Sequence, residues 1–156
     1  MTESGWASEL EMAKTFFNNS TACLTEEDAD YAPVPGVFTV KGHVAHVART
    51  VEWFIEGAFG SGWDLNFEQH AAEAEAVASL AEAREWVERA FQHAKNVVSA
   101  KTEDELRECF PASDPMMPGA PKLVAVTGIS DHTAHHRGAL TVYARLRGKV
   151  PAMPYA

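Results

Sequence analysis

Apolar residues recur every three or four positions along four long segments of the chain, which is the period of an amphipathic α-helix. No segment keeps the two-residue alternation of a half-buried strand. We predict helices from about Glu3 to Asn19, about Val40 to Ala58, roughly Ala71 to Ser99, and about Pro121 to Arg147. Four long periodic helices predict an all-α fold, an antiparallel four-helix bundle.

Capping residues and helix breakers mark several ends of these segments. Thr39 can cap the second helix through its hydroxyl. Thr102 and Glu105 form the pattern of a capping box, which predicts a short additional helix. Gly148 and Pro151 stop the last helix. Three basic residues near that end are predicted to interact with the helix dipole: Arg145, Arg147 and Lys149.

Length and composition fit one domain that spans residues 1–156. The chain has 156 residues, of which 46% are hydrophobic, and can bury a core. A net charge of −9 would repel nucleic-acid phosphates and anionic lipid, so we expect neither nucleic acid nor membrane as a partner. The N-terminus is acidic where a secretory signal would be basic, and no apolar run reaches the about 18 residues of a membrane helix. We therefore expect a cytoplasmic protein.

The stretch DHTAHHRGAL, residues 131–140, holds three of the chain's seven histidines. At about 100° per residue, His132 and His136 share the apolar stripe of the last helix with Ile129 and Tyr143. Two imidazoles four residues apart can both reach one metal ion at about 2.0 to 2.1 Å. A lone buried histidine is more often satisfied by a neighbouring hydroxyl or carbonyl, but two on one apolar stripe favour a chelating pair.

A third ligand has to come from another helix, and the second helix offers His43 and His46. His43 projects nearer to the centre of the apolar stripe, whereas His46 shares a flank with Thr50 and Trp53. Helix geometry alone leaves both candidates open. The remaining histidines are expected in a loop, on a polar helix face, or rotated away from the pair: His70, His93 and His135.

Two familiar helical metal sites do not fit the sequence. A zinc-protease motif H-E-x-x-H needs glutamate where Thr133 follows His132. A di-iron bundle needs E-x-x-H pairs, and no histidine in this chain has a glutamate three residues before it. A mononuclear site of three histidines with open positions remains, which is typical of catalytic rather than structural metal sites.

Two segments carry a family resemblance. DHTAHHRGALTVYARLRGKVPAMPY resembles the C-terminal signature of the DinB/YfiT-like superfamily, and PVPGVFTVKGHVAHVARTVEWFIEGAF resembles its second-helix region. The resemblance implies a bacterial four-helix bundle that binds one divalent metal ion through three histidines. By that pattern the ligands are His46, His132 and His136, with His46 preferred to His43. Zinc, nickel and iron all suit three imidazoles, so the metal's identity stays open.

The resemblance also implies a range of functions. Members with assigned chemistry include S-transferases that use low-molecular-weight thiols, so we expect a metal-dependent transferase with a small-molecule substrate and such a thiol. A metal-dependent hydrolase, or a bundle that binds a metal or ligand without turning it over, is the alternative. A homodimer is a candidate assembly. No catalytic residue is assigned, although Tyr143 and Arg137 are the nearest polar groups on the last helix, and Thr50 and Trp53 are expected to form one wall of the cleft.

Overall fold

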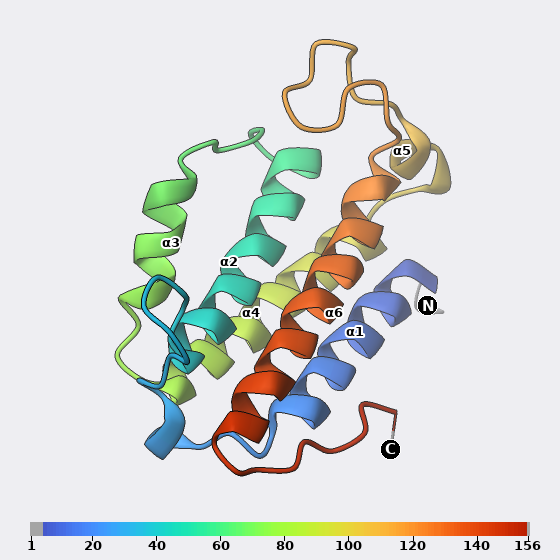
Figure 1. The fold of residues 1–156 in the computed structure, drawn as a ribbon. Coiled ribbons are helices and arrows are strands. Elements are labelled where there is room, and N and C mark those ends of the chain that lie inside the picture. The colour runs from blue at the N-terminus through green and yellow to red at the C-terminus, as the bar shows by residue number, and fades with distance from the viewer. Residues whose placement is uncertain (1–4, 156) are drawn as a thin grey trace.

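The computed structural model describes residues 5–155, and within them the secondary structure is helical with no strand. Four long helices form a bundle (Figure 1): α1 (Gly5–Thr21), α2 (Val40–Phe59), α4 (Leu80–Ser99) and α6 (Leu123–Leu146). Shorter elements lie between them: the 3-10 helix η1 (Glu26–Asp28), α3 (Phe67–Glu75) and α5 (Glu103–Arg107). The predicted all-α bundle is confirmed. Glu3, where the first helix was expected to begin, lies outside the described residues.

The third predicted helix is wrong in one respect, because it is two helices. The α3 helix ends at Glu75, and α4 begins at Leu80. Ser79 caps α4, since its hydroxyl accepts a hydrogen bond of 3.0 Å from the backbone N–H of Glu82. The α3 helix also starts earlier than expected, at Phe67, where the Asn66 side chain accepts from the Gln69 N–H.

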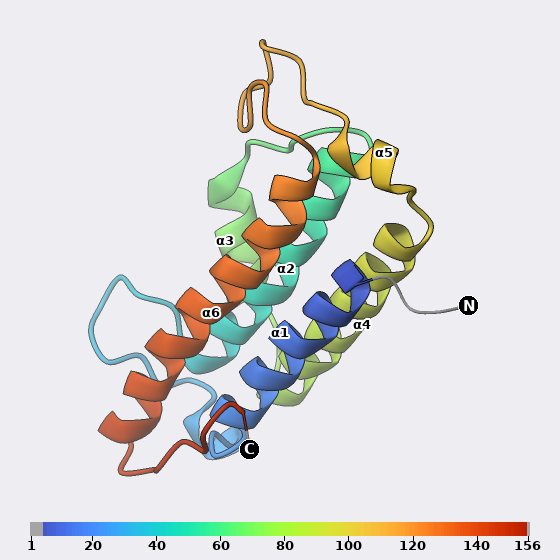
Figure 2. The ribbon, with the colours of Figure 1, turned by 90° about the vertical axis from the view of Figure 1, so that its right-hand side faces the viewer.

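This break sets the directions of the long helices. Because α3 runs back along α2, the chain can start α4 at the same end of the bundle as α2, and the two helices run parallel (Figures 1 and 2). The α1 and α6 helices are parallel neighbours as well, whereas α6 runs antiparallel to α2, and α4 to α1. The first turns of α2 therefore lie beside the last turns of α6.

The core runs along the middle of the bundle and is built from the apolar stripes seen in the sequence. Each long helix contributes side chains that are fully buried: Leu10, Phe17, Val44, Val51, Val87, Phe91, Ile129 and Leu140. Burial of one such side chain stabilises the fold by about 1.5 to 3 kcal/mol. Among the described residues, none of the helices combines the length and hydropathy needed to cross a bilayer.

A buried carboxylate ties the end of α6 to the segment that follows α1. Asp28 is fully buried, and it accepts hydrogen bonds from the Arg147 guanidinium at 3.0 Å, the Thr25 backbone N–H at 2.9 Å, and the Lys149 ammonium. We call Asp28, Arg147 and Lys149 the Asp28 cluster. Burial alone would raise the pKa of Asp28, but these hydrogen bonds outweigh burial and lower it. Arg147 and Lys149 thus bind a specific partner instead of acting only on the helix dipole.

A second polar contact fixes the start of α2. As predicted, Thr39 caps this helix, and its hydroxyl accepts a hydrogen bond of 3.1 Å from the Gly42 N–H. The Glu75 carboxylate at the end of α3 accepts from the Thr39 N–H at 2.8 Å and from the Thr39 hydroxyl at 2.7 Å. A Cβ atom at Gly42 would stand 2.5 Å from that carboxylate, so a larger residue there would displace the Glu75 side chain from Thr39. The contact between Glu75 and Thr39 fixes the first turn of α2, which holds His43.

Candidate metal centre

Four imidazoles meet where α2 and α6 cross, and we call them the histidine cluster: His43, His46, His132 and His136. The two from α6 are one helical turn apart, with ring centroids separated by 4.2 Å. The His46 ring from α2 lies 5.1 Å from His132 and 4.7 Å from His136. The predicted inward-facing pair therefore meets histidines of the second helix.

Three members of the cluster bring their ligand atoms together. His46, His132 and His136 each offer one ring nitrogen, and these nitrogens lie within 4.8 Å of one another. The Nε2 atoms of His132 and His136 are 2.9 Å apart. Two ligands of a tetrahedral zinc ion, each about 2.0 to 2.1 Å from the metal, are about 3.3 Å apart. The two Nε2 atoms on α6 therefore need to move apart by only a few tenths of an ångström to bind such an ion.

The environment of these imidazoles keeps them neutral, which is the protonation state that a metal needs. Burial lowers the pKa of His132 to about 3 and that of His136 to about 2, and the neighbouring histidines add to the effect. Burial likewise lowers the pKa of His46. Phe38 stacks on the His46 ring at 4.8 Å and shields it from water. The Nδ1 atom of His46 is buried and makes no hydrogen bond within residues 5–155, so no group among these residues occupies this ring nitrogen. The residues present therefore fit a divalent metal ion.

His43 belongs to the cluster, but its ring nitrogens are not among those that converge. Its side chain is buried, and its Nε2 atom lies 2.6 Å from Nδ1 of His136, on the far side of that ring from His132. Burial is the main cause that lowers the pKa of His43 to about 4. Of the two second-helix candidates, His46 is the one whose ligand atom converges with those of the α6 pair.

The other histidines lie apart from the point of convergence. His93 is exposed on α4, and His135 is exposed on α6 beside His136. His70 differs from its prediction, because it lies in α3 and is buried rather than in a loop. Its Nε2 atom is 2.9 Å from a carboxylate oxygen of Asp64. The helical stretch that holds it was expected to begin only at Ala71.

Two cavities border the histidine cluster. The smaller, about 230 Å³, contains His46 and His132 in its wall together with aromatic side chains of α2 and α3: Trp53, Phe54 and Phe67. The larger, about 600 Å³, is bordered by His43 and His136, with Phe38, Glu75 and Tyr143 in its wall. Thr50 and Trp53 line the smaller cavity, as expected for a wall of the cleft. The candidate metal centre is thus bordered by two cavities.

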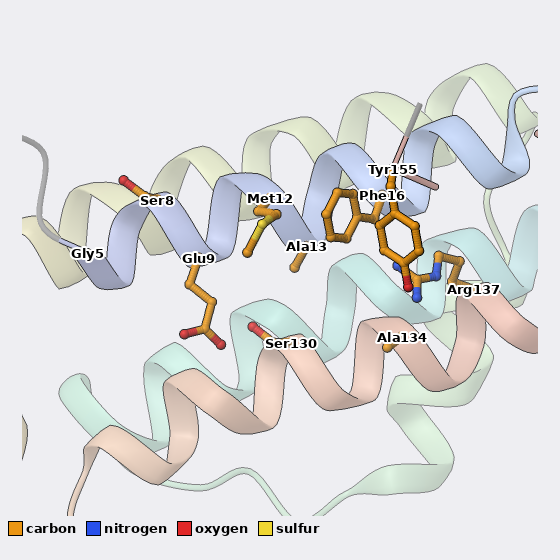
Figure 3. A pocket seen from close by; sticks show the side chains of 10 residues that line it. All are labelled: Gly5, Ser8, Glu9, Met12, Ala13, Phe16, Ser130, Ala134, Arg137 and Tyr155. Carbon is orange, nitrogen blue, oxygen red and sulfur yellow. The ribbon is translucent and has the colours of Figure 1, made fainter. Parts of the chain in front are cut away.

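A third cavity, about 550 Å³, lies between α1 and α6 (Figure 3), and none of its lining residues is a histidine. Arg137 lines this cavity rather than the two beside the histidine cluster, and its guanidinium lies 5.7 Å from the Phe16 ring. Tyr143 does border the histidine cluster, with its ring 5.3 Å from that of His43, and its hydroxyl donates to the Phe38 carbonyl at 3.2 Å. Of the two polar groups considered on the last helix, only Tyr143 is near the site.

Sequence reasoning missed the part of the site that α3 and the preceding connector provide. Phe67 and Ala71 line the smaller cavity, while Phe38 and Glu75 line the larger one. One signal could have revealed α3 as a separate helix, because Ser79 and Glu82 match the capping-box spacing in the middle of the expected long helix. No local signal marks Phe38 as the residue that stacks on His46.

A bundle whose α2 and α6 bring three imidazole nitrogens together is a candidate metal protein of the mononuclear, three-histidine class. The chain belongs to the DinB family, whose model matches residues 6–156. It is similar in structure to a conserved protein from Enterococcus faecalis, with a TM-score of 0.69 and 19% identity over 90% of this chain and 94% of the other. No curated protein matches the sequence.

A second solved structure has a related fold. YfiT from Bacillus subtilis aligns with a TM-score of 0.66 and 15% identity, over 92% of this chain and 86% of that one. It is described as a probable metal-dependent hydrolase with an unusual four-helix bundle topology. At these identities the two structures establish only the fold of this chain. The arrangement of its histidines is known from its own structure.

Proposed function

We propose that this protein binds one divalent metal ion through His46, His132 and His136 and catalyses a metal-dependent reaction on a small molecule. The observation that carries the proposal is the convergence of three ring nitrogens beside two cavities. Three protein ligands leave coordination positions open, as in catalytic metal sites. A metal bound there supplies Lewis-acid chemistry, which lowers the pKa of a bound thiol or water and makes it a nucleophile near neutral pH.

The side chains around the ligands define what the substrate can be. The smaller cavity is walled by Trp53, Phe54 and Phe67, so it suits a compact apolar or aromatic group of the electrophile. Arg49 lines the same cavity and is paired with Glu73 at 3.0 Å, which leaves the cavity without a strong net charge from this pair. The apolar walls exclude water from the reacting atoms and orient the electrophile toward His46 and His132.

The larger cavity favours a thiol rather than water as the nucleophile. A volume of about 600 Å³ beside His136 is far more than a water molecule occupies, and it accepts a molecule of the size of a low-molecular-weight thiol. In the proposed reaction the thiol sulfur forms a bond to the electrophilic carbon, and the leaving group departs with the bonding electron pair. The thiol proton passes to solvent or to the leaving group. Glu75, His135 and Tyr143 give this cavity polar groups that can orient the thiol.

Metal analysis tests the binding step. Protein purified without a polyhistidine tag should contain close to one equivalent of zinc, nickel or iron. Alanine at His46, His132 or His136 should lower metal affinity by at least about 100-fold, since loss of an outer partner alone costs about 10- to 100-fold. His93→Ala, which removes an exposed histidine, is the matched control and should retain the metal. Full occupancy in His46→Ala would show that the ligand set is wrong.

A thiol assay tests the chemistry. Metal-loaded protein is incubated with a panel of low-molecular-weight thiols and a generic electrophile, and thiol consumption is compared with that of His136→Ala. We expect faster consumption with the wild-type chain for at least one thiol. Equal rates across the panel would exclude thiol transfer.

Hydrolysis is the second candidate, because the structurally similar YfiT is described as a probable metal-dependent hydrolase. A panel of ester and amide substrates, with His132→Ala as the control, separates the two reactions. Metal-dependent turnover of these substrates without any thiol would favour hydrolysis. Metal binding with no turnover in either assay would favour a bundle that binds a metal or ligand without catalysis.

A further inference from the structure

His43 makes the most direct contact with the candidate ligands of any residue outside them. Its Nε2 atom lies 2.6 Å from Nδ1 of His136, a hydrogen-bond distance. The other nitrogen of His136, Nε2, is the one that lies 2.9 Å from Nε2 of His132. His136 therefore has one ring nitrogen directed at His43 and the other directed at the point where the ligands converge.

Only one arrangement of protons is compatible with a metal on His136. A metal takes the lone pair of Nε2, so the single proton of the neutral ring has to be on Nδ1. That N–H then donates to Nε2 of His43, which has to be unprotonated at this position. His43 carries its own proton on Nδ1, an atom that is buried and has no hydrogen-bond partner within residues 5–155. The contact thus links the tautomer of one histidine to that of the other.

We propose that His43 is a positioning residue for the metal centre: it accepts the hydrogen bond from Nδ1–H of His136 and holds the tautomer and ring orientation that present Nε2 to the ion. This inference rests on the proposed metal at His46, His132 and His136. Metal-bound histidines usually donate their second N–H to a carboxylate, a carbonyl or water. In this protein a buried imidazole takes that place.

The surroundings of His43 hold its ring still. The side chain is 5% exposed, and its ring packs against those of Tyr143 at 5.3 Å and Phe38 at 6.0 Å. Its turn of α2 is anchored by the contact between Thr39 and Glu75. A rigid acceptor reduces the number of orientations that His136 can adopt before the metal binds, and so it strengthens binding.

Three variants separate this role from simple packing. In His43→Phe a ring of similar shape remains but the acceptor is lost. In His43→Gln the side-chain carbonyl oxygen can stand near the position of Nε2 and accept the same hydrogen bond. His135→Phe is the matched control, because His135 is exposed and its ring lies 4.9 Å from His136 on the same helix.

The first measurement is zinc affinity, determined by competition with a chromophoric chelator. We expect His43→Phe to weaken binding by about 10- to 100-fold, and His43→Gln and His135→Phe to stay within about threefold of the wild type. Wild-type affinity in His43→Phe would overturn the positioning role alone. A wild-type chain that binds no zinc would overturn the metal site and the inference together.

The second measurement reports the hydrogen bond itself. In zinc-loaded protein with ¹⁵N-labelled histidine, the His136 Nδ1–H should give a slowly exchanging proton signal in the wild type and in His43→Gln. That proton should exchange faster in His43→Phe, while circular dichroism shows the same helix content. A His136 that is protonated on Nε2 in the zinc-loaded wild type, or a slowly exchanging Nδ1–H in His43→Phe, would overturn the inference.

Discussion

The Asp28 cluster and the histidine cluster both bury polar groups against α6, but they differ in how those groups are partnered. In the Asp28 cluster a fully buried carboxylate accepts hydrogen bonds from two cations and one backbone N–H. In the histidine cluster the hydrogen-bond contacts run from one imidazole to another, and two buried ring nitrogens have no partner within residues 5–155. One cluster is saturated with opposite charge, and the other has no acidic hydrogen-bond partner within residues 5–155.

This difference separates groups that stabilise the fold from groups that can bind a ligand. A buried carboxylate stabilises a fold when its charge is balanced, and removing one member then leaves an uncompensated charge. Buried imidazoles without acidic partners stay neutral and add little stability, but their lone pairs are available to a cation. We therefore expect mutations in the two clusters to act on different properties.

The largest expected effect on stability is that of Asp28→Ala. The substitution leaves Arg147 and Lys149 without their carboxylate and the Thr25 N–H without its acceptor. Loss of one member of a buried ion pair costs about 3 to 5 kcal/mol, and the lower end applies because the two cations are partly exposed. Urea unfolding followed by circular dichroism measures the change. Glu88→Ala, which removes a half-exposed partner of Lys14, is the control and should cost less than about 1 kcal/mol.

Zinc should stabilise the wild-type chain through the histidine cluster. At a free concentration 100 times the dissociation constant, a ligand specific for the folded state adds about 2.7 kcal/mol to the free energy of unfolding. Chelated protein should still fold, because the buried apolar stripes do not need the ion. His132→Ala should lose the zinc effect, whereas Asp28→Ala should keep it. A chelated wild-type sample without helical signal, or equal zinc stabilisation in His132→Ala, would contradict this prediction.

The two clusters should lower the free energy of unfolding over different pH ranges as the solution is acidified. The folded-state pKa values of His43 and His132, about 4 and about 3, lie below the ordinary value near 6.5. As pH falls below about 6.5 the unfolded chain therefore takes up protons that the folded chain does not, and stability falls by up to about 1.4 kcal/mol per pH unit for each group. Because the pKa of Asp28 is lowered in the folded state, its carboxylate contributes fully to the free energy of unfolding above about pH 3.9. This contribution is lost only as pH falls below that value.

Metal-free variants test this order. Between pH 6.5 and 4, the slope of unfolding free energy against pH should be smaller in His132→Ala than in the wild type. Asp28→Ala should share the wild-type slope in that range and differ from it only below about pH 4. Identical slopes for His132→Ala and the wild type throughout would mean that His132 is protonated in the folded state at neutral pH, or titrates as it does in the unfolded chain.

The two clusters also differ in how well the sequence predicts them. The spacing of His132 and His136 on an amphipathic helix predicts that they point inward together, because helix periodicity is a local property. The choice between His43 and His46 depends on how α2 is rotated against α6, which periodicity does not determine. Both residues contact His136 in the folded chain, one through a hydrogen bond and the other through ring packing.

The burial of Asp28 has no local signal at all. It lies in the acidic stretch TEEDAD, which reads as an exposed connector, and its partners Arg147 and Lys149 come from the far end of the chain. Helix periodicity also missed the break between α3 and α4, because apolar spacing continues across Val77 and Leu80 while Ser79 caps a new helix. Pairings of this kind depend on tertiary packing, which overrides local preference.

Tyr143→Phe tests whether the two clusters are independent, and it should have the smallest effect. The Tyr143 ring lies 5.3 Å from His43 and 6.2 Å from Tyr31, which is itself 5.2 Å from the Arg147 guanidinium. The substitution keeps the ring but leaves the Phe38 carbonyl without the hydroxyl donor, which costs about 1 kcal/mol. Zinc affinity should change by less than about threefold, because the acceptor on His43 is untouched.

Combining this change with Asp28→Ala makes the test quantitative. Mutations at sites that do not share a partner usually add within about 0.3 to 0.5 kcal/mol, and Tyr31 is the residue through which these two sites could couple. We expect the double variant to lose the sum of the two single losses, measured by urea unfolding of metal-free protein. A coupling well above 0.5 kcal/mol would show that α6 carries one connected polar network, so that loss of the Asp28 cluster would also disturb the orientation of His43.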